Sequence, residues 1–196
     1  MSKAFTQWQK ANLSYQNYID YIRAKSEKYE LTFIDLLYIS NFKGGNASIH
    51  EKEISVNAKL KKYTECLKTI HNEFDDKQLR DLSNEELESL KCKTSEFVNL
   101  TSRNSTAIDG VKSSYVSALL HFHFPNLIPI LDRRVLNGTG IKRVKKGEQV
   151  KDIEKYYPKL IDNFYRYLQQ NRNKSLRDYD RENFIKPVQD EEAASA

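Results

Sequence analysis

Apolar residues recur at steps of three and four along most of the chain, and this spacing is typical of helices that bury one face. The chain has only six glycines and four prolines, so long stretches contain no residue that breaks a helix. The first two predicted helices have their apolar positions at Leu13, Tyr15, Tyr18, Ile19 and Ile22, and at Phe33, Leu36, Leu37 and Ile39. Residues 29–32 interrupt the pattern between them. The spacing predicts an all-α protein.

The middle of the chain contains several signals for helix ends. Residues 42–49 carry a Gly-Gly turn and an Asn-Ala-Ser sequence able to cap a third helix. The apolar face of that helix would consist of Ile54, Ala58, Leu60, Tyr63, Leu67 and Ile70. Asp75 and Asp76 indicate a further helix start, and residues 83–86 form a capping box before another helix. The loss of periodicity over 94–108 indicates where that helix ends and a connection begins.

The most apolar helix is predicted after the Asp-Gly turn at 109–110, and Pro125 ends it. Its apolar positions are Tyr115, Val116, Ala118, Leu119, Phe122 and Phe124. A helix of this kind crosses the centre of a helical domain. A short helix is expected after Asp132, then a basic loop over 140–147, then an amphipathic helix with Pro158 in its first turn. The apolar positions of this last helix are Ile153, Tyr156, Leu160, Ile161, Phe164, Tyr165 and Leu168.

The length of 196 residues allows a buried core without disulfides or a metal. We expect one compact helical domain over 1–186, either undivided or made of two close-packed lobes, and a disordered tail over 187–196. Cys66 and Cys92 lack the spacing of zinc or iron–sulfur ligands, which favours a reduced intracellular protein without a metal or cofactor. Neither an apolar leader nor a run of ~18 apolar residues occurs. We therefore expect a cytoplasmic protein that does not bind a membrane.

Positive charge is concentrated in one part of the chain. The net charge is +5, and residues 142–181 contain twelve Lys or Arg against six Asp or Glu, so this segment carries +6 and the remainder −1. Such asymmetry favours a phosphate-rich partner, although basic surfaces are also common on proteins that bind none.

One carboxylate, Asp132, stands out as a candidate for chemistry. It follows the apolar run of residues 129–131 and precedes Arg133 and Arg134, so an acid emerges from a buried segment beside two fixed positive charges. Such a residue can serve catalysis, or it can cap the following helix by accepting backbone N–H groups. The two roles are compatible, because a capped carboxylate stays ionised near neutral pH.

Two histidines, His121 and His123, form an HxH pattern that invites a metal interpretation. On a helix, however, residues two apart point in different directions and do not easily bind one ion. We expect both to be structural or hydrogen-bonded. No metal site is predicted.

Residues 108–137 resemble part of the helix-hairpin-helix superfamily of DNA glycosylases, which includes endonuclease III, adenine DNA glycosylase and 8-oxoguanine DNA glycosylase. In that family a leucine-proline-glycine-valine-glycine hairpin opens an apolar helix, and a catalytic aspartate follows a short apolar phrase with proline. Here the sequence Ile-Asp-Gly-Val-Lys begins at Ile108, and Phe-Pro-Asn-Leu-Ile-Pro-Ile-Leu-Asp ends at Asp132. The resemblance implies a two-lobed helical fold with a helix-hairpin-helix-like element.

The resemblance also implies roles for individual residues. Asp132 would stabilise positive charge on the sugar and help a water attack C1′. Ser114 stands where bifunctional members have a lysine, which implies base removal without a Schiff base or strand cleavage. The residues expected to contact nucleic acid, as hairpin or basic rim, are Gly110, Lys112, Ser113, Arg133, Arg134, Lys142, Arg143, Lys145 and Lys146.

Two function classes follow from the resemblance, and a helical protein unrelated to the superfamily is the third alternative. The first is a monofunctional DNA glycosylase acting on duplex DNA, with the target base flipped out of the helix. The second is a catalytically silent module of the same fold that binds nucleic acid or a protein, with Asp132 only capping a helix.

Overall fold

A computed structural model describes residues 3–44, 49–142, 145–146, 149–150 and 152–186. Within these residues the fold is all-helical apart from one very short strand pair. The α-helices are α1 (Lys3–Ala24), α2 (Phe33–Phe42), α3 (Glu53–Phe74), α4 (Asn84–Asn99), α5 (Ser113–His123), α6 (Arg133–Gly138), α7 (Tyr157–Gln170) and α8 (Leu176–Ile185). Single 3₁₀ turns lie at η1 (Leu79–Asp81), η2 (Leu100–Ser102) and η3 (Ile153–Tyr156). The all-α prediction is confirmed.

A short strand pair begins within the segment 140–147, which the sequence predicted to be a basic loop. Strand β1 (Lys145–Lys146) pairs antiparallel with β2 (Gln149–Val150). Two residues per strand add little to the fold, which is built by the packing of helices.

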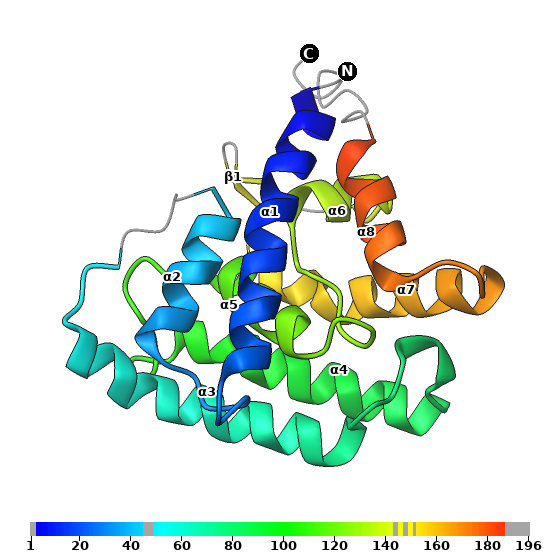
Figure 1. Cartoon of the computed structure of the whole chain (residues 1–196). Helices are drawn as coiled ribbons and strands as arrows, with labels where there is room; N and C mark the ends of the chain where they lie inside the picture. Colours follow the sequence, from blue (N-terminus) through cyan, green and yellow to red (C-terminus); the bar gives the residue numbers. More distant parts are fainter. Residues whose placement is uncertain (1–2, 45–48, 143–144, 147–148, 151, 187–196) are drawn as a thin grey trace.

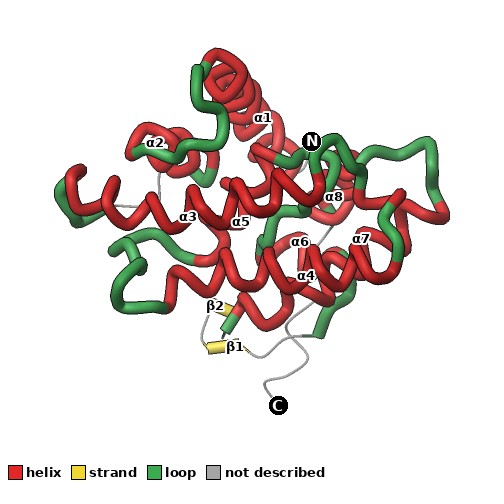
Figure 2. The backbone as a smooth tube through the Cα atoms, turned by 90° about the horizontal axis from the view of Figure 1, so that it is seen from below, coloured by secondary structure: helices red, strands yellow, loops and turns green. Residues whose placement is uncertain are grey.

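The helices enclose one core with α5 at its centre. Helices α3 and α4 pack side by side along one edge of the molecule, and α5 lies against α4 and α2 (Figure 1; Figure 2). Nine of the eleven residues of α5 are buried, as its apolar sequence predicts. Helix α1 packs against α2, and α8 packs against both α1 and α6. The first and last α-helices therefore pack together on one side of the core (Figure 1).

Four apolar positions assigned to buried faces are exposed instead, among them Ala58 of α3. Leu13 is 72% exposed, Leu37 50% and Ile54 80%. In α1 the buried stripe passes through Trp8, Tyr15, Tyr18 and Ile22. Leu13 lies two positions before Tyr15, which turns it about 200° around the helix and away from the stripe. The same offset of two separates Ile54 from the buried stripe of α3, which begins at Val56.

Two predicted helix boundaries were wrong. Asp75 and Asp76 end α3 rather than starting a helix: Asp75 is the C-cap, and Asp76 has a left-handed φ of 58°. The N-cap of α3 is Lys52. The Asn-Ala-Ser sequence at 46–48, which was expected to cap this helix, lies outside the described residues. The capping box at Ser83 is confirmed, with its hydroxyl accepting the backbone N–H of Glu86.

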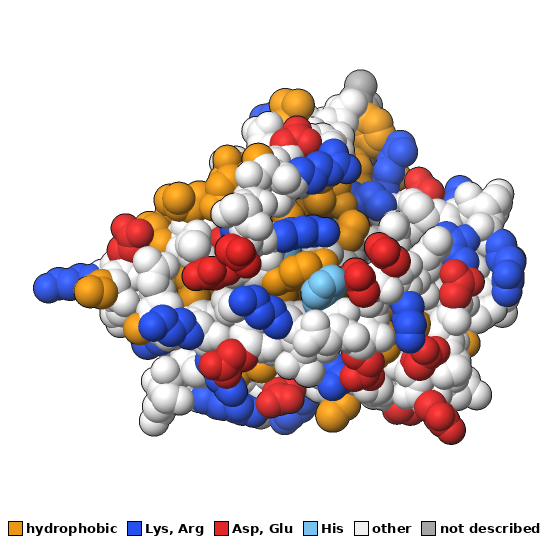
Figure 3. All heavy atoms as spheres, turned by 60° about the horizontal axis from the view of Figure 1, so that its bottom comes forward, with side chains coloured by type: hydrophobic (Ala, Val, Ile, Leu, Met, Phe, Trp, Pro, Cys, Tyr) orange, Lys and Arg blue, Asp and Glu red, His pale blue; other side chains and the backbone are white. Residues whose placement is uncertain are grey.

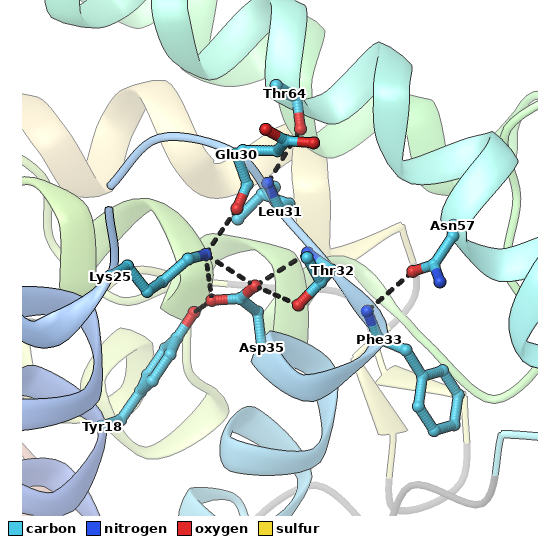
Figure 4. Close-up of polar contacts among 9 residues, drawn as sticks. All are labelled: Tyr18, Lys25, Glu30, Leu31, Thr32, Phe33, Asp35, Asn57 and Thr64. Carbon is cyan, nitrogen blue, oxygen red and sulfur yellow. Dashed lines mark hydrogen bonds and ion pairs between the residues drawn. The ribbon is translucent and has the colours of Figure 1, made fainter. Parts of the chain in front are cut away.

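A buried ion pair joins Lys25, the residue that follows α1, to the first turn of α2 (Figure 4). The Asp35 carboxylate, which is fully buried, accepts hydrogen bonds from Lys25 Nζ at 2.9 and 3.1 Å and from Tyr18 Oη at 3.0 Å. It also accepts the backbone N–H of Thr32 at 2.7 Å, which completes a capping box. A buried charge with this many partners is compensated, so the network fixes the angle between α1 and α2.

Candidate active site

A cavity of about 750 Å³ opens between α1, the end of α2, the segment leading into α6, and α8. Its walls combine aromatic rings with charged groups. The rings are those of Trp8, Phe42 and Phe184, and two carboxylates, Asp132 and Asp180, also line it. A cavity of roughly 300–1,000 Å³ with a few convergent polar groups is typical of a ligand or active site.

The apolar run before Asp132 is held in place by hydrogen bonds from two other elements. The hydroxyl of Ser117, in the second turn of α5, accepts the backbone N–H of Leu131 at 3.0 Å. Tyr157 Oη, at the start of α7, donates to the Pro129 carbonyl at 2.9 Å. Both bonds are buried, so the backbone that presents Asp132 is rigid.

Asp132 is both a helix cap and part of an ion pair. Its Oδ1 accepts the backbone N–H of Arg134 at 2.8 Å, and its Oδ2 lies 2.6 Å from Lys43 Nζ at the end of α2. Burial alone would raise the pKa of the Asp132 carboxyl, but the charge of Lys43 and the two hydrogen bonds outweigh burial and lower it. The side chain remains 21% exposed. Asp132 is thus an ionised carboxylate at the cavity surface.

The second carboxylate, Asp180, comes from α8, a helix that the sequence pattern did not predict. Its side chain is 3% exposed, and Oδ2 accepts a hydrogen bond from Arg177 Nη1 at 2.8 Å. Burial raises the pKa of the Asp180 carboxyl to about 6, against the opposing charge of Arg177. The guanidinium of Arg177 lies 3.8 Å from the ring centroid of Trp8 and 4.3 Å from that of Tyr15. Cation–π contacts with both rings hold it.

Arg134 and Arg133 follow Asp132 and differ in their surroundings. The Arg134 guanidinium lies 4.9 Å from the ring centroid of Phe184. The Arg133 side chain is exposed. Both line the cavity, as Asp132 does. Three consecutive predicted site residues therefore meet there.

The predicted hairpin residues lie outside the cavity lining. Gly110 has a φ of 86°, and the N–H of Val111 donates to the Ile108 carbonyl at 3.0 Å, which closes a tight turn. Lys112 is exposed with an extended backbone and caps α5. Ser113 is buried, and its hydroxyl lies 3.4 Å from Glu154 Oε2, so this side chain is directed into the protein. A contact of Ser113 with nucleic acid would therefore involve its backbone rather than its hydroxyl, and it stays a prediction.

The remaining predicted residues are only partly described. The carbonyl of Ser114, half-buried on the first turn of α5, accepts the Ser117 hydroxyl at 3.0 Å. Lys142 is exposed. Arg143 lies outside the described residues, and Lys145 and Lys146 are described only as the backbone of β1.

Both histidines of the HxH pattern are buried structural residues. His121 Nδ1 lies 2.8 Å from the Ile128 carbonyl and therefore donates to it, while Nε2 lies 3.3 Å from Tyr15 Oη. Burial lowers the pKa of His121 and of His123 to about 3, so both rings are neutral. Within the described part of the chain no group of three or more metal-ligating side chains is assembled.

Comparison of the chain with family models, curated proteins and solved structures finds no match. None of the helices in the described ranges has the length and apolar character needed to cross a bilayer.

Proposed function

We propose that this protein is a monofunctional DNA N-glycosylase of the helix-hairpin-helix type, with Asp132 as its catalytic carboxylate. The observation that carries the proposal is an ionised carboxylate, held by a rigid backbone, at the surface of an aromatic-lined cavity. A base flipped out of duplex DNA is planar and apolar on its faces, and it would pack in a cavity whose lining includes the rings of Trp8, Phe42 and Phe184.

Asp132 would stabilise the positive charge that develops at C1′ as the glycosidic bond breaks. It would also orient the water that attacks C1′. Ser114 supplies no amine, which favours hydrolysis over Schiff-base chemistry. The ion pair with Lys43 keeps Asp132 charged before the substrate binds.

Duplex DNA would bind where the cavity opens and where α5 begins. The turn at Gly110 leads into the N-terminus of α5, whose cap, Lys112, makes no side-chain hydrogen bond to the helix. Backbone N–H groups at a helix start and an exposed lysine favour a phosphate. Exposed Arg133 and Lys142 extend the positive charge. The face over α3 and α4, by contrast, mixes acidic and basic side chains (Figure 3).

The proposal is tested by measuring alkali-labile abasic sites in fluorescein-labelled duplexes that carry a panel of damaged or modified bases. Asp132→Asn should lower base release at least 100-fold while duplex binding is retained, because the amide cannot supply the charge. Asp20→Asn is the matched control, since that carboxylate is 69% exposed on α1 and does not line the cavity. Equal release by wild type and Asp132→Asn would contradict the assignment.

A catalytically silent module is the second candidate, and one observation favours it. Both Asp132 oxygens already have partners within the protein, the Arg134 N–H and Lys43 Nζ. A purely structural carboxylate would look the same. Salt-sensitive duplex binding without base release by the wild type, together with a lower melting temperature for Asp132→Asn, would support this second candidate.

A further inference from the structure

The cavity holds a second carboxyl whose chemistry differs from that of Asp132. Asp180 is nearly fully buried, and only its Oδ2 is engaged, by Arg177. Its Oδ1 has no hydrogen-bond partner among the described residues. A buried polar atom without a partner costs free energy, so such atoms are rare except where a ligand or water completes them. This oxygen is itself buried, and it belongs to a residue that lines the cavity.

The surroundings of the two carboxyls separate their protonation states. Lys43 and the Arg134 N–H favour the charged form of Asp132. Asp180 is buried and lies within reach of the Asp132 charge, and both effects favour its protonated form, while Arg177 and Lys43 oppose them. The neighbouring phenol of Tyr15 has a raised pKa because it is buried, so it stays neutral. Two carboxyls separated in this way are the usual arrangement of an acid beside an ionised group.

We propose that Asp180 is a second catalytic residue of this cavity, the acid that protonates the departing base while Asp132 stabilises the sugar. This inference rests on the proposed glycosylase activity. It assigns the acid that is needed when the base to be released is neutral. A neutral base is a poor leaving group because its ring nitrogen leaves with a negative charge. A base that already carries a positive charge needs no such acid.

The atoms and electrons of the step balance. The bond between C1′ and the base nitrogen breaks, and its electron pair stays with the base. The proton of Asp180 passes to the base, leaving Asp180 as a carboxylate. Water adds its oxygen to C1′ and loses one proton, which returns through solvent to Asp180. The products are the free neutral base and an abasic site.

Arg177 gives this acid a fixed position. Its guanidinium is held between Trp8 and Tyr15 of α1 and binds only Oδ2 of Asp180. The proton is therefore expected on Oδ1, the atom without a partner. Arg177 is a positioning residue in this scheme.

The test measures single-turnover release of a neutral base from duplex DNA between pH 5 and 8. Wild-type release should fall as pH rises above about 6, the pKa of Asp180, by up to tenfold per pH unit. Asp180→Asn should lower release about 100-fold at pH 6 and remove the decrease of release above pH 6, with duplex affinity unchanged. Asp180→Glu, which keeps an acid, should retain part of the rate and the decrease of release with rising pH.

Glu182→Gln is the matched control. It removes a carboxylate from the same helix, but Glu182 pairs with Lys174 and Tyr167 and does not line the cavity. Its pH profile should match that of the wild type.

The failure of this inference is distinguishable from failure of the proposed function. A wild-type profile that is flat from pH 5 to 8 overturns the role of Asp180 even if no Asp180 variant folds. Release by Asp180→Asn equal to that of the wild type overturns it as well. Absence of release by the wild type at every pH overturns the proposed function, and the role of Asp180 with it.

Discussion

At the scale of single residues, His123 is a buried ring that works against folding in acid. Both of its nitrogens lack hydrogen-bond partners among the described residues. Burial, helped by the charges of Lys25 and Lys28, lowers its pKa to about 3. The folded-state pKa of His123 lies below its unfolded value of about 6.5. The free energy of unfolding is therefore unaffected by protonation of this ring above pH 6.5, and it decreases as pH falls from about 6.5 towards 3.

We expect His123→Phe to raise the free energy of unfolding by about 1 kcal/mol at pH 7, because a buried polar group without partners is removed. This increase in the free energy of unfolding should be larger at pH 5, because His123 is protonated in the unfolded wild type but stays neutral in the folded protein. Urea unfolding at both values measures this, with the exposed His50→Gln as control. A gain that does not grow between pH 7 and pH 5 would contradict the protonation argument.

Lys43 is the residue on which the charge of Asp132 depends. Lys43→Met removes a cation 2.6 Å from that carboxylate, so the pKa of Asp132 should rise and the protein should lose about 2 kcal/mol of stability. The value is reduced from that of a fully buried pair because solvent reaches both side chains. Chemical unfolding and a carboxyl titration by NMR measure the two effects. Lys10→Met, an exposed cation on the same cavity, should change neither.

At the scale of elements, α6 and α8 depend on a glycine where they meet. A Cβ at Gly138 would lie 2.7 Å from Cα of Asn183 in α8, which is closer than real side chains come. Gly140, two residues on, has open space around it but a φ of 71°. A side chain at Gly138 would thus clash with α8, whereas a side chain at Gly140 would only strain the backbone.

We expect Gly138→Ala to destabilise the protein by about 3 kcal/mol, because α8 must move away from α6. Gly140→Ala should cost only about 1 kcal/mol, from its left-handed backbone. Melting temperatures rank the two variants, and base release shows whether moving α8 and Asp180 disturbs the cavity. Equal destabilisation would mean that α8 gives way easily and does not hold the cavity wall.

The elements also show what the sequence can predict. Helix starts signalled by local chemistry, such as the capping box at Ser83 and the turn at Gly110, were found because caps depend on neighbouring residues alone. Asp132 was identified for the same reason. Helix α8 was missed because it is mostly polar, and its buried positions include Asp180 and Asn183. Their burial is decided by α1 and α6, which are distant in the sequence.

At the scale of the whole molecule, positive charge is unevenly distributed along the sequence, with +6 over residues 142–181 and −1 over the remainder. The mixed charges over α3 and α4 (Figure 3) contrast with the exposed Lys112, Arg133 and Lys142. A phosphate backbone releases bound cations when it is neutralised, so each lysine or arginine that contacts it steepens the dependence of affinity on salt.

Lys112→Ala and Arg133→Ala should therefore each reduce the slope of log affinity against log salt by about one, and weaken binding to all duplex sequences alike. Fluorescence anisotropy of a labelled duplex over a salt series measures the slope. Lys62→Ala on α3, 49% exposed and ion-paired with Glu65, is the control and should leave it unchanged. An equal decrease of this salt dependence in all three variants would mean that affinity for DNA depends only on the net charge of the protein. The cavity would then not face the duplex, and the proposed flipping of a base into it would lose its physical basis.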